Sequence, residues 1–383
     1  MRVDFNVPLN KDGSISDDTR LRESLPSIQY ILQAGGSAIL MSHLGRPKNG
    51  PDPQFSLAPC AKALSKLLGR PVLMAEDCVG PIVEKMIHNL QPGHVLLLEN
   101  VRFYPAEEKP SSDPLFAKQL AALGDIYVND AFGAAHRSHS STSTIAQFFP
   151  GKAAAGLLLQ KEISFLGHLL THPKRPFYAL IGGAKISSKM GVLKSLISKV
   201  DGIFIGGGMA FTAFQAQGLN IGNSIHEDDQ VPIAAEFLKE CAKRQVPCWL
   251  PTDLVIADDF REDAHTKIIT VANGIPDGWQ GMDIGPQTLT EWKNTLQSAG
   301  TVFWNGPPGV FEFPAFAKGT EEIARTLSSL KATTIVGGGD SVAAINRLHL
   351  ASKFTHVSTG GGASLEYIEF GHLPGIDALS DGG

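Results

Sequence analysis

The sequence has few of the features that mark special classes of protein. It contains four cysteines, Cys60, Cys78, Cys241 and Cys248, and none of them forms a Cys-x-x-Cys pair. A disulfide framework is therefore not indicated, and free thiols in a reducing compartment are expected. The chain has no signal peptide and no apolar run long enough to span a bilayer. The cytoplasm is the expected location.

The chain also lacks an excess of charge of one sign. It carries 33 Lys and Arg against 38 Asp and Glu, a net charge of −5. This mild negative charge argues against nucleic acid as the main partner. Any anion site must then be local and built from a few basic groups. With 383 residues, 43% of them hydrophobic, the chain reads as an ordinary globular protein of two domains, each with its own core.

Short strand-like runs alternate with longer segments of helical spacing, and no internal repeat interrupts them. Such alternation predicts parallel sheets joined by right-handed crossover helices. The clearest helical segments are 57–70 and 113–124. The strand candidates are "GSAILMS" (36–42), "HVLLLEN" (94–100), "GDIYVND" (124–130), "FYALIGG" (177–183), "DGIFIGGG" (201–208), "TVFWNG" (301–306) and "ATTIVGGG" (332–339).

The residues that follow these strands differ between the two halves of the chain. Charged residues follow strands in the first half, as in "SHLGRP" and "NDAFGAAHR", whereas glycines follow them in the second half, as in "GGAK" and "GGGDS". We therefore expect two α/β domains with different ligands. The segment "GLLLQKEISFLGHLL" (156–170) has helical spacing and is predicted to connect them.

Glycine runs in the second half suggest a site for a nucleotide with several phosphates. Three runs occur, Gly206–Gly208, Gly337–Gly339 and Gly360–Gly362, together with "GGAK". Ligands of open parallel sheets bind beyond the carboxyl ends of the strands, where helix N-termini offer free N–H groups. Glycine allows a phosphate to approach the backbone closely. One such run would be ordinary turn chemistry, but several in one half favour a phosphate cradle.

The first half offers arginines and histidines in place of glycines. Arg20, Arg46, Arg102 and Arg137 lie on four separate segments, with His43 and His136 nearby. Because a guanidinium grips carboxylate and phosphate through two parallel hydrogen bonds, these residues could converge on one small anion. Solvated surface arginines are the alternative. A metal site using His136 and His139 is another, although no cysteine or acidic residue completes a recognisable ligand set, and His139 could simply pack locally.

Common motifs of other enzyme classes are missing from the sequence. "GGAKISSK" departs from the G-x-x-x-x-G-K-[ST] pattern of a P-loop, and no G-x-G-x-x-G opens a helix. The H-R-D and D-F-G motifs of protein kinases and the G-x-S-x-G elbow of α/β-hydrolases are also missing. These classes are therefore disfavoured.

Nine motifs in order resemble those of the phosphoglycerate kinase family, and the resemblance covers essentially the whole chain. They are "RVDFNVP", "SHLGRP", "LLLENVRF", "YVNDAFGAAHRSHSS", "IGGAKISSK", "IGGGMAF", "WNGPPGVFE", "VGGGDS" and "STGGGASLE". The resemblance implies two Rossmann-like, three-layer α/β/α domains with parallel sheets. The implied boundaries are 1–155 plus 366–383 for a phosphoglycerate-binding domain, 156–170 for the connecting helix, and 171–365 for a nucleotide-binding domain.

The resemblance also implies residues for two binding sites. Catalysis is expected from Arg20 and Lys185, and Asp340 is the expected residue for Mg²⁺. The implied phosphoglycerate site comprises Asp4, Asn6, Arg20, His43, Leu44, Gly45, Arg46, Arg102, His136 and Arg137. The implied nucleotide site comprises Lys185, Lys189, Gly207, Gly208, Gly281, Asn305, Glu312, Gly338, Gly339, Asp340 and Ser341.

The function implied by this resemblance is phosphoryl transfer from 1,3-bisphosphoglycerate to Mg-ADP, giving 3-phosphoglycerate and Mg-ATP in glycolysis. The expected protein is a cytoplasmic monomer that closes its domains about the connecting helix, with no nucleic acid or membrane partner. The alternatives are a catalytically impaired nucleotide-binding protein of the same fold and another two-domain kinase acting on a small acid.

One departure from the family concerns the start of the chain. Family members usually carry a further stretch before "RVDFNVP", so Met1 would stand inside the first strand. Asp4 and Asn6 are then expected to lie on a weakly anchored terminus that frays.

Overall fold

A computed structural model describes residues 1–48 and 50–379 of the chain. The chain divides into two compact units. The first comprises Met1–Ser164 and the C-terminal segment that begins at His372, and the second comprises Phe165–Gly371. None of the helices in the described ranges combines the length and hydropathy needed to cross a bilayer. All four cysteines are free thiols, as the sequence predicted.

The first unit contains a parallel sheet whose middle is formed by the start of the chain. Strands β1 (Ala38–Leu40), β3 (Val95–Leu97) and β2 (Val72–Met74) pair in the order β1-β3-β2, and β4 (Tyr127–Asn129) pairs with β5 (Ala153–Ala155). Arg2 forms parallel bridges to Met41 on one side and to Asn129 on the other. The N-terminal segment thus lies between β1 and β4 and joins the two groups of strands.

The expectation that the terminus frays is wrong for these residues. The backbone N–H of Arg2 donates to the carbonyl of Val128 (2.7 Å), and that of Val3 donates to the carbonyl of Met41 (3.0 Å). The side chains of Val3 and Phe5 are fully buried in the core. Hydrogen bonds to both neighbouring strands and apolar burial therefore hold Asp4 and Asn6 firmly.

The helices of the first unit begin and end at residues suited to those positions. Helix α2 (Ala58–Leu68) has a proline in its first turn and is followed by Gly69, whose φ of +65° is left-handed. At the start of α5, the Asp113 carboxylate accepts the backbone N–H of Leu115 (3.0 Å). The helices are α1 (Thr19–Gln33), α2 (Ala58–Leu68), α3 (Pro81–His88), α4 (Pro105–Glu108), α5 (Pro114–Ala121) and α14 (Pro374–Asp377).

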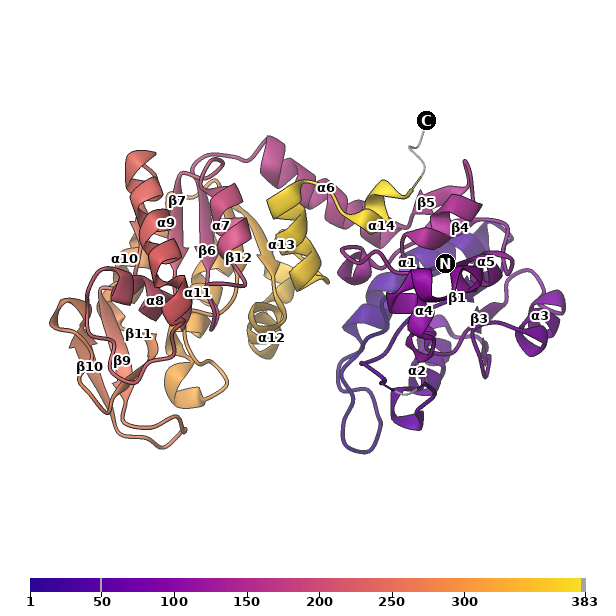
Figure 1. Cartoon of the computed structure of the whole chain (residues 1–383), viewed down its shortest axis with the longest axis horizontal. Coiled ribbons are helices and arrows are strands. Elements are labelled where there is room, and N and C mark those ends of the chain that lie inside the picture. Colours follow the sequence, from indigo (N-terminus) through magenta and orange to yellow (C-terminus); the bar gives the residue numbers. More distant parts are fainter. Residues whose placement is uncertain (49, 380–383) are drawn as a thin grey trace. The chain divides into compact units, whose positions relative to one another are not determined.

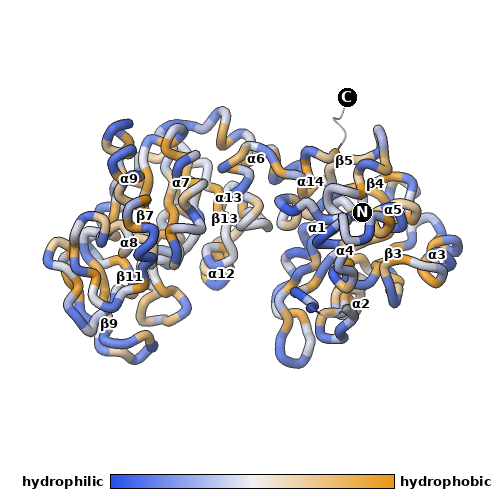
Figure 2. The backbone as a smooth tube through the Cα atoms, viewed as in Figure 1, coloured by the Kyte–Doolittle hydropathy of each residue, from blue (hydrophilic) through white to orange (hydrophobic). Residues whose placement is uncertain are grey.

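The second unit is built on a six-stranded parallel sheet in the order β14-β13-β12-β6-β7-β8. Its strands are apolar and buried, as in "FYALI", which explains why they read as continuous hydrophobic runs. They are β6 (Phe177–Ile181), β7 (Gly202–Ile205), β8 (Cys248–Trp249), β12 (Thr301–Asn305), β13 (Thr333–Gly337) and β14 (His356–Val357). Figure 1 labels β6, β7 and β12 of this sheet, and Figure 2 marks the hydrophobic segments of the backbone in orange.

Helices and a second sheet complete this unit. Side chains of α10, α11 and α12 pack with those of β6, β7, β12 and β13 in one core that includes Trp292 and Trp304. The helices are α7 (Met190–Leu196), α8 (Met209–Ala216), α9 (Val231–Lys243), α10 (Pro286–Leu296), α11 (Lys318–Ser329), α12 (Gly339–Arg347) and α13 (Gly361–Phe370). An antiparallel sheet, which the sequence pattern did not predict, is formed by β10 (Thr266–Thr270), β9 (Asp253–Ala257) and β11 (Gln280–Ile284).

Helix α6 (Leu157–Thr171) begins in the first unit and ends in the second. The fully buried carboxylate of Asp130 accepts the backbone N–H groups of Leu158 (2.9 Å) and Leu159 (3.1 Å), which ties the first turn of the helix to the end of β4. In its later part, the ring of Phe165 stacks on that of His356 at 4.6 Å between centroids. Each half of the helix is thus fixed to its own unit.

Candidate functional site

An open pocket of about 260 Å³ lies in the first unit, at the carboxyl ends of its parallel strands. Four arginines and two histidines line it, with Asp4 as the one acidic residue among its described lining. The lining residues are Asp4, Asn6, Arg20, His43, Gly45, Arg46, Arg102, Gly133, Ala134, His136 and Arg137. The structure thus brings together nine of the ten residues that the sequence proposed for phosphoglycerate.

The tenth residue, Leu44, is placed differently. Its side chain is 3% exposed and belongs to the core of the first unit, with Val3 and Phe5. Its backbone nevertheless lies between His43 and Gly45, which both line the pocket, and its carbonyl accepts a hydrogen bond from the amide nitrogen of Asn100 (2.7 Å). Leu44 therefore anchors the loop after β1 rather than facing a ligand with its side chain.

Asn100 connects the segments that contain Leu44, Phe55 and Arg102 by hydrogen bonds. Its buried Nδ2 donates to the carbonyls of Leu44 and Phe55 (2.9 Å), while its Oδ1 accepts the backbone N–H of Arg102 (3.0 Å). Gly45, in the same loop, has a φ of +62°, and a Cβ there would stand 2.4 Å from the ring of Phe55. A side chain at position 45 is thus excluded by both backbone strain and close contact.

The N-terminal motif also contributes residues to the lining of the pocket. The Oδ1 atom of Asn6 accepts the backbone N–H of Gly45 (2.9 Å), so Asn6 fixes the loop after β1 as well as lining the pocket. The carboxylate of Asp4 is 2.7 Å from Nη1 of Arg20 and is almost buried, with 7% of its surface exposed. This ion pair holds the Arg20 side chain, which leaves α1, against the pocket.

The other three arginines differ in whether other residues hold their side chains. Arg102 donates from Nη1 to the carbonyl of Gly45 (2.8 Å), and its Nε lies 3.2 Å from Glu108. Burial lowers the pKa of Arg102 from its usual value, although a guanidinium stays charged. Within residues 1–48 and 50–379, Arg46 and Arg137 have no ion-pair partner, and both side chains are exposed. These two are available to an incoming anion.

The histidines of this pocket are neutral at physiological pH. Burial, followed by the charges of Arg2, Arg102 and Arg20, lowers the pKa of His43 well below 6.5. Burial and the neighbouring Arg137 lower the pKa of His136 to about 4. The positive charge of the pocket therefore comes from arginine, while the histidines offer neutral hydrogen-bonding groups.

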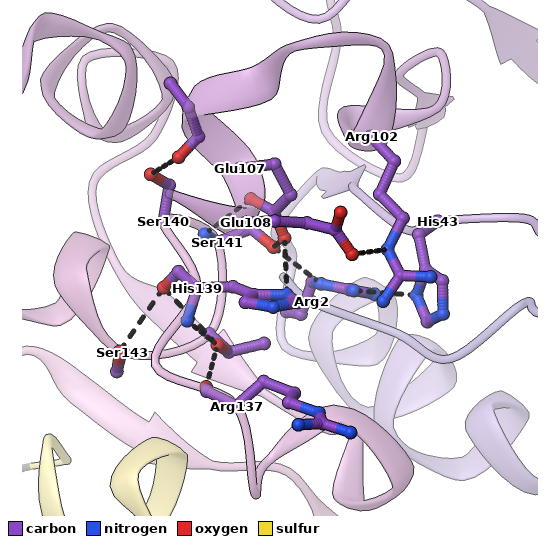
Figure 3. A network of polar contacts seen from close by, with 12 residues as sticks. Arg2, His43, Arg102, Glu107, Glu108, Arg137, His139, Ser140, Ser141 and Ser143 are labelled. Atoms are coloured by element: carbon purple, nitrogen blue, oxygen red, sulfur yellow. Dashed lines mark hydrogen bonds and ion pairs between the residues drawn. The ribbon is translucent and has the colours of Figure 1, made fainter. Parts of the chain in front are cut away.

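His139 does not line the pocket. It lies behind it, largely buried, with its Nδ1 atom 3.7 Å from the buried carboxylate of Glu107 (Figure 3). Burial and the charges of Arg102 and Arg2 lower its pKa to about 3. Its backbone carbonyl accepts the N–H groups of Ser143 (3.0 Å) and Thr144 (3.2 Å), so the residue organises the loop that follows Arg137.

A second pocket, of about 420 Å³, lies in the other unit and is lined mainly by backbone and apolar groups. Gly207 (φ +69°) and Gly208 follow β7, and Gly281 lies in β11. A Cβ at Gly281 would stand 2.1 Å from the ring of Phe211, so only glycine keeps this wall open. Glu312 and Asp340 are the predicted polar residues in its lining.

Three of the remaining predicted nucleotide residues, Lys189, Gly338 and Ser341, lie around Asn305 and Gly306 at the end of β12. Lys189 donates from Nζ to Oδ1 of Asn305, and Ser341 accepts the backbone N–H of Gly306 on its hydroxyl (2.6 Å). The Nδ2 group of Asn305 is buried without a hydrogen-bond partner among the described residues, which is unusual because buried donors are normally paired. A phosphate oxygen is the kind of acceptor that this donor lacks.

Charge and helix geometry make this corner suitable for an anion. Burial lowers the pKa of Lys189 to about 8, while Asp340 acts in the opposite direction. Helix α12 starts at Gly339, and Gly338 precedes it with a φ of +93°. Lys185 is exposed, and its carbonyl accepts a hydrogen bond from Ser188 (2.9 Å). Lys185 does not line the pocket, nor do Lys189, Asn305, Gly338, Gly339 or Ser341.

The structure adds residues that sequence reasoning did not single out. Arg2 and Glu107 form a buried polar array behind the first pocket, and Gly133 and Ala134 belong to its lining. In the second unit, Phe211 and Asp283 line the pocket. Arg2 stands inside the motif "RVDFNVP", which was a usable signal, whereas nothing in the local sequence around Glu107 distinguishes it from a surface carboxylate.

Three comparisons describe what this chain is similar to. The family model for phosphoglycerate kinase matches residues 1–370. Phosphoglycerate kinase of Moorella thermoacetica is 54% identical over 381 residues, covering 100% of this chain and 95% of that protein. Cytosolic phosphoglycerate kinase of Nicotiana tabacum is 51% identical over 384 residues, covering 100% of this chain and 94% of that protein.

Solved structures agree with this similarity. The structure of phosphoglycerate kinase from Coxiella burnetii superposes with a TM-score of 0.86 at 38% identity, covering 99% of this chain and 94% of the other. That from Pyrococcus horikoshii superposes with a TM-score of 0.85 at 32% identity, with the same coverage of 99% and 94%. The fold expected from the sequence, two Rossmann-like α/β units with parallel sheets, is thereby confirmed.

Proposed function

The chain belongs to the phosphoglycerate kinase family, and from this premise we propose how its two pockets divide the reaction. The enzyme is a phosphotransferase with a carboxyl group as acceptor. It reversibly transfers the acyl phosphate of 1,3-bisphosphoglycerate to ADP, giving 3-phosphoglycerate and ATP, a step of glycolysis. The pocket of the first unit binds the phosphoglycerate, and the pocket of the second unit with its Asn305 corner binds the nucleotide.

The observation that carries this division is the concentration of arginine in the first pocket. Arg20, Arg46, Arg102 and Arg137 face one acidic residue there, Asp4, so four positive groups less one negative group leave an excess of three. The whole chain carries a net charge of −5. A small ligand with a carboxylate at one end and a phosphate at the other satisfies both this charge and the planar geometry of guanidinium groups.

The second pocket suits a nucleotide for a different reason. Its glycine loops bring backbone N–H groups near the start of α12, where an anion is stabilised. The unpaired Nδ2 donor of Asn305 and the ammonium of Lys189 extend this cradle towards phosphate oxygens. Glu312, in the lining, is the proposed ligand of the ribose.

Mg²⁺ fits the residues present, with Asp340 as its protein ligand. Among residues 1–48 and 50–379, no three His, Cys, Asp or Glu side chains are grouped as a ready-made metal site. Magnesium in phosphoryl-transfer enzymes is held by one or two carboxylates together with substrate phosphates and water, and this pattern needs no such group. When bound, the ion would neutralise charge on the nucleotide phosphates.

Catalysis in this proposal rests on positioning and charge. The attacking group is already an anion, whether carboxylate or ADP β-phosphate, so no general base is required. Arg20 and Lys185 are the proposed groups that stabilise the moving phosphoryl group, Arg20 from the first unit and Lys185 from the second. Asp4 holds the Arg20 side chain through the 2.7 Å ion pair.

The test is ATP-dependent phosphorylation of 3-phosphoglycerate, coupled to a reporter dehydrogenase. Arg20→Ala should lower kcat by about 10²–10³, the scale for losing one donor to a transition-state oxyanion. Arg22→Ala is the matched control, because Arg22 lies on the same helix and pairs with half-buried Asp18 at 2.8 Å outside the pocket. An increase in KM with an unchanged kcat would contradict a transition-state role for Arg20.

Domain closure is the second part of the proposal. Because the proposed catalytic residues belong to different units, both substrates together should make the protein more compact than either alone. Small-angle scattering with 3-phosphoglycerate and a non-hydrolysable ATP analogue measures this. An unchanged radius of gyration with both ligands bound would refute closure.

Cellular location and assembly complete the proposal. We expect a cytoplasmic monomer whose partners are its small-molecule substrates. Cell fractionation followed by activity assay, and sedimentation of the purified protein near its chain mass of 40.9 kDa, test the two statements. Activity in a membrane fraction, or a sedimenting species of twice that mass, would contradict them.

A further inference from the structure

Arg2 lies directly behind the first pocket and contacts one of its histidines. Its side chain is 1% exposed. Its Nη2 atom is 3.0 Å from Nδ1 of His43, and its Nε donates to the hydroxyl of Ser141 (2.7 Å). Its Nη1 donates to the carbonyl of Val3 and, at 3.4 Å, to Ser42. Figure 3 shows Arg2 extended between His43 and the segment that carries Ser140 and Ser141.

The chemistry of the guanidinium decides where the proton of His43 resides. Arginine has N–H donors and no acceptor, so Nδ1 of His43 must accept in the contact with Arg2. A neutral imidazole has one donor and one acceptor nitrogen, which leaves its proton on Nε2. A second proton, on Nδ1, would break this hydrogen bond and place an imidazolium against a buried guanidinium.

The orientation of Arg2 is itself determined by a buried carboxylate. Ser141 donates from its hydroxyl to Oε1 of Glu107 (2.6 Å) and from its backbone N–H to Oε2 (3.0 Å). Because the hydroxyl proton is directed to Glu107, the oxygen of Ser141 is left to accept from Nε of Arg2. Glu107 is fully buried, and burial raises the pKa of its carboxyl, while the charge of Arg2 and the two hydrogen bonds from Ser141 act in the opposite direction. The hydrogen bonds from Ser141 to Glu107, from Arg2 to Ser141 and from Arg2 to His43 thus each have one direction.

We propose that Arg2 is a positioning residue that presents His43 to the phosphoglycerate as a neutral Nε2–H donor. His43 lines the pocket, and its Nε2 has no hydrogen-bond partner among residues 1–48 and 50–379. A carboxylate or phosphate oxygen of the ligand would accept this hydrogen. The inference rests on the proposed function of the first pocket for the identity of that ligand, but the state of His43 follows from the contacts of Arg2 alone.

Burial is the main reason that the ring of His43 disfavours a positive charge, and the guanidinium groups of Arg2, Arg102 and Arg20 act in the same sense. The histidine therefore differs in its role from the arginines of the pocket. It supplies a directed neutral donor, whereas they supply charge.

The direct test is nitrogen NMR of the ligand-free protein labelled in its histidines. In the wild type, Nδ1 of His43 should resonate as a bare ring nitrogen and Nε2 as a protonated one, without change from about pH 6 to about pH 8. In Arg2→Met this preference should be lost. A protonated Nδ1 in the wild type, or an unchanged His43 spectrum in Arg2→Met, would overturn the inference.

Two adjacent serines provide a matched pair for the kinetic test. Ser140 and Ser141 are both fully buried, and each hydroxyl makes one hydrogen bond as donor, but only Ser141 contacts Arg2. Ser141→Ala should raise KM for 3-phosphoglycerate about tenfold and leave KM for ATP within about twofold, since one hydrogen bond is worth roughly a factor of ten. Ser140→Ala should leave both KM values unchanged.

Equal effects of the two serine variants on KM for 3-phosphoglycerate would overturn the positioning role, because a general loss of packing would affect both. Arg2→Lys covers the case in which Arg2→Met does not fold. It keeps the charge but cannot reach Ser141 and His43 together, so it should show the Ser141→Ala defect. The spectra require no substrate. Failure of the wild type to phosphorylate 3-phosphoglycerate would therefore refute the proposed function, while the spectra would still decide whether Arg2 controls His43.

Discussion

Replacing Asn100 by aspartate should impair binding in the first pocket and leave binding in the second pocket unchanged. The change exchanges one NH₂ group for an oxygen at a fully buried site. In the native protein this NH₂ group donates to the carbonyls of Leu44 (2.7 Å) and Phe55 (2.9 Å). In the variant, a carboxylate oxygen would face both carbonyls. The other oxygen would still accept the N–H of Arg102.

The expected loss of stability follows from the two hydrogen bonds that the variant cannot make. A buried polar group left without its partner costs about 1–3 kcal/mol, and two carbonyls lose theirs, so the free energy of unfolding of the first unit should fall by about 2–6 kcal/mol. The loop that carries Gly45 would lose its tie to Asn100 through the Leu44 carbonyl, while Arg102 would still donate to the Gly45 carbonyl at 2.8 Å. A tenfold to hundredfold rise in KM for 3-phosphoglycerate, about 1.4–2.8 kcal/mol, is the expected kinetic result.

The assay is steady-state kinetics in the direction of ATP consumption, together with urea unfolding followed by hydrogen exchange in each unit. KM for ATP should be unchanged, because Asn100 belongs to the unit without the nucleotide pocket. Asn89→Asp is the control, since it adds the same charge at an exposed position of the same unit and should alter stability by less than about 0.5 kcal/mol. An unchanged KM for 3-phosphoglycerate in Asn100→Asp would refute the reasoning, as would an equal rise in both KM values.

Three further outcomes can be measured. Because burial lowers the pKa of Lys189 to about 8, KM for ATP should rise as the pH passes about 8 while KM for 3-phosphoglycerate stays level; parallel profiles would contradict this. Burial raises the pKa of Asp283 from 3.8 to about 7. Between about pH 4 and pH 7 the folded state therefore binds a proton at Asp283 that the unfolded state has lost. The free energy of unfolding should fall as the pH rises through this range, by up to ~1.4 kcal/mol per pH unit. Asp283→Asn should remove this slope in urea unfolding, and a variant with the same slope would show that another group is responsible. Gly156→Ala would place a Cβ 2.3 Å from the Asp130 carboxylate that caps α6 and should lower the urea midpoint by an amount equivalent to about 1–3 kcal/mol, whereas Gly124→Ala, with its nearest neighbour at 3.9 Å, should not.

Much of the second pocket could be predicted from local sequence. Gly207, Gly281 and Gly338 each stand where a side chain would strain the backbone or meet a neighbour. Such positions leave a signature in the residue type itself, because only glycine satisfies them. The parallel strands of both units were equally visible, since their buried apolar runs are continuous and are followed by turn residues.

The partners of the charged residues were not visible in the same way. Arg46 and Arg102 follow predicted strands, so their convergence could be expected from the rule that the carboxyl ends of parallel strands share one edge. The anchoring of Asp4 and Asn6 could not, because it depends on hydrogen bonds from residues 2 and 3 to strands far away in the chain. The expectation of a fraying terminus failed for this reason.

The sequence by itself thus determined the family, the alternation of strands and helices, and the residue types that can bind phosphate and carboxylate. Only the tertiary structure decided which of those residues carry a charge, which have a partner, and toward which atom each hydrogen bond points. Arg2 and Glu107 are more than a hundred positions apart and meet through Ser141, so no local pattern records their contact. The proton on His43 depends on that contact, because a buried arginine can only donate.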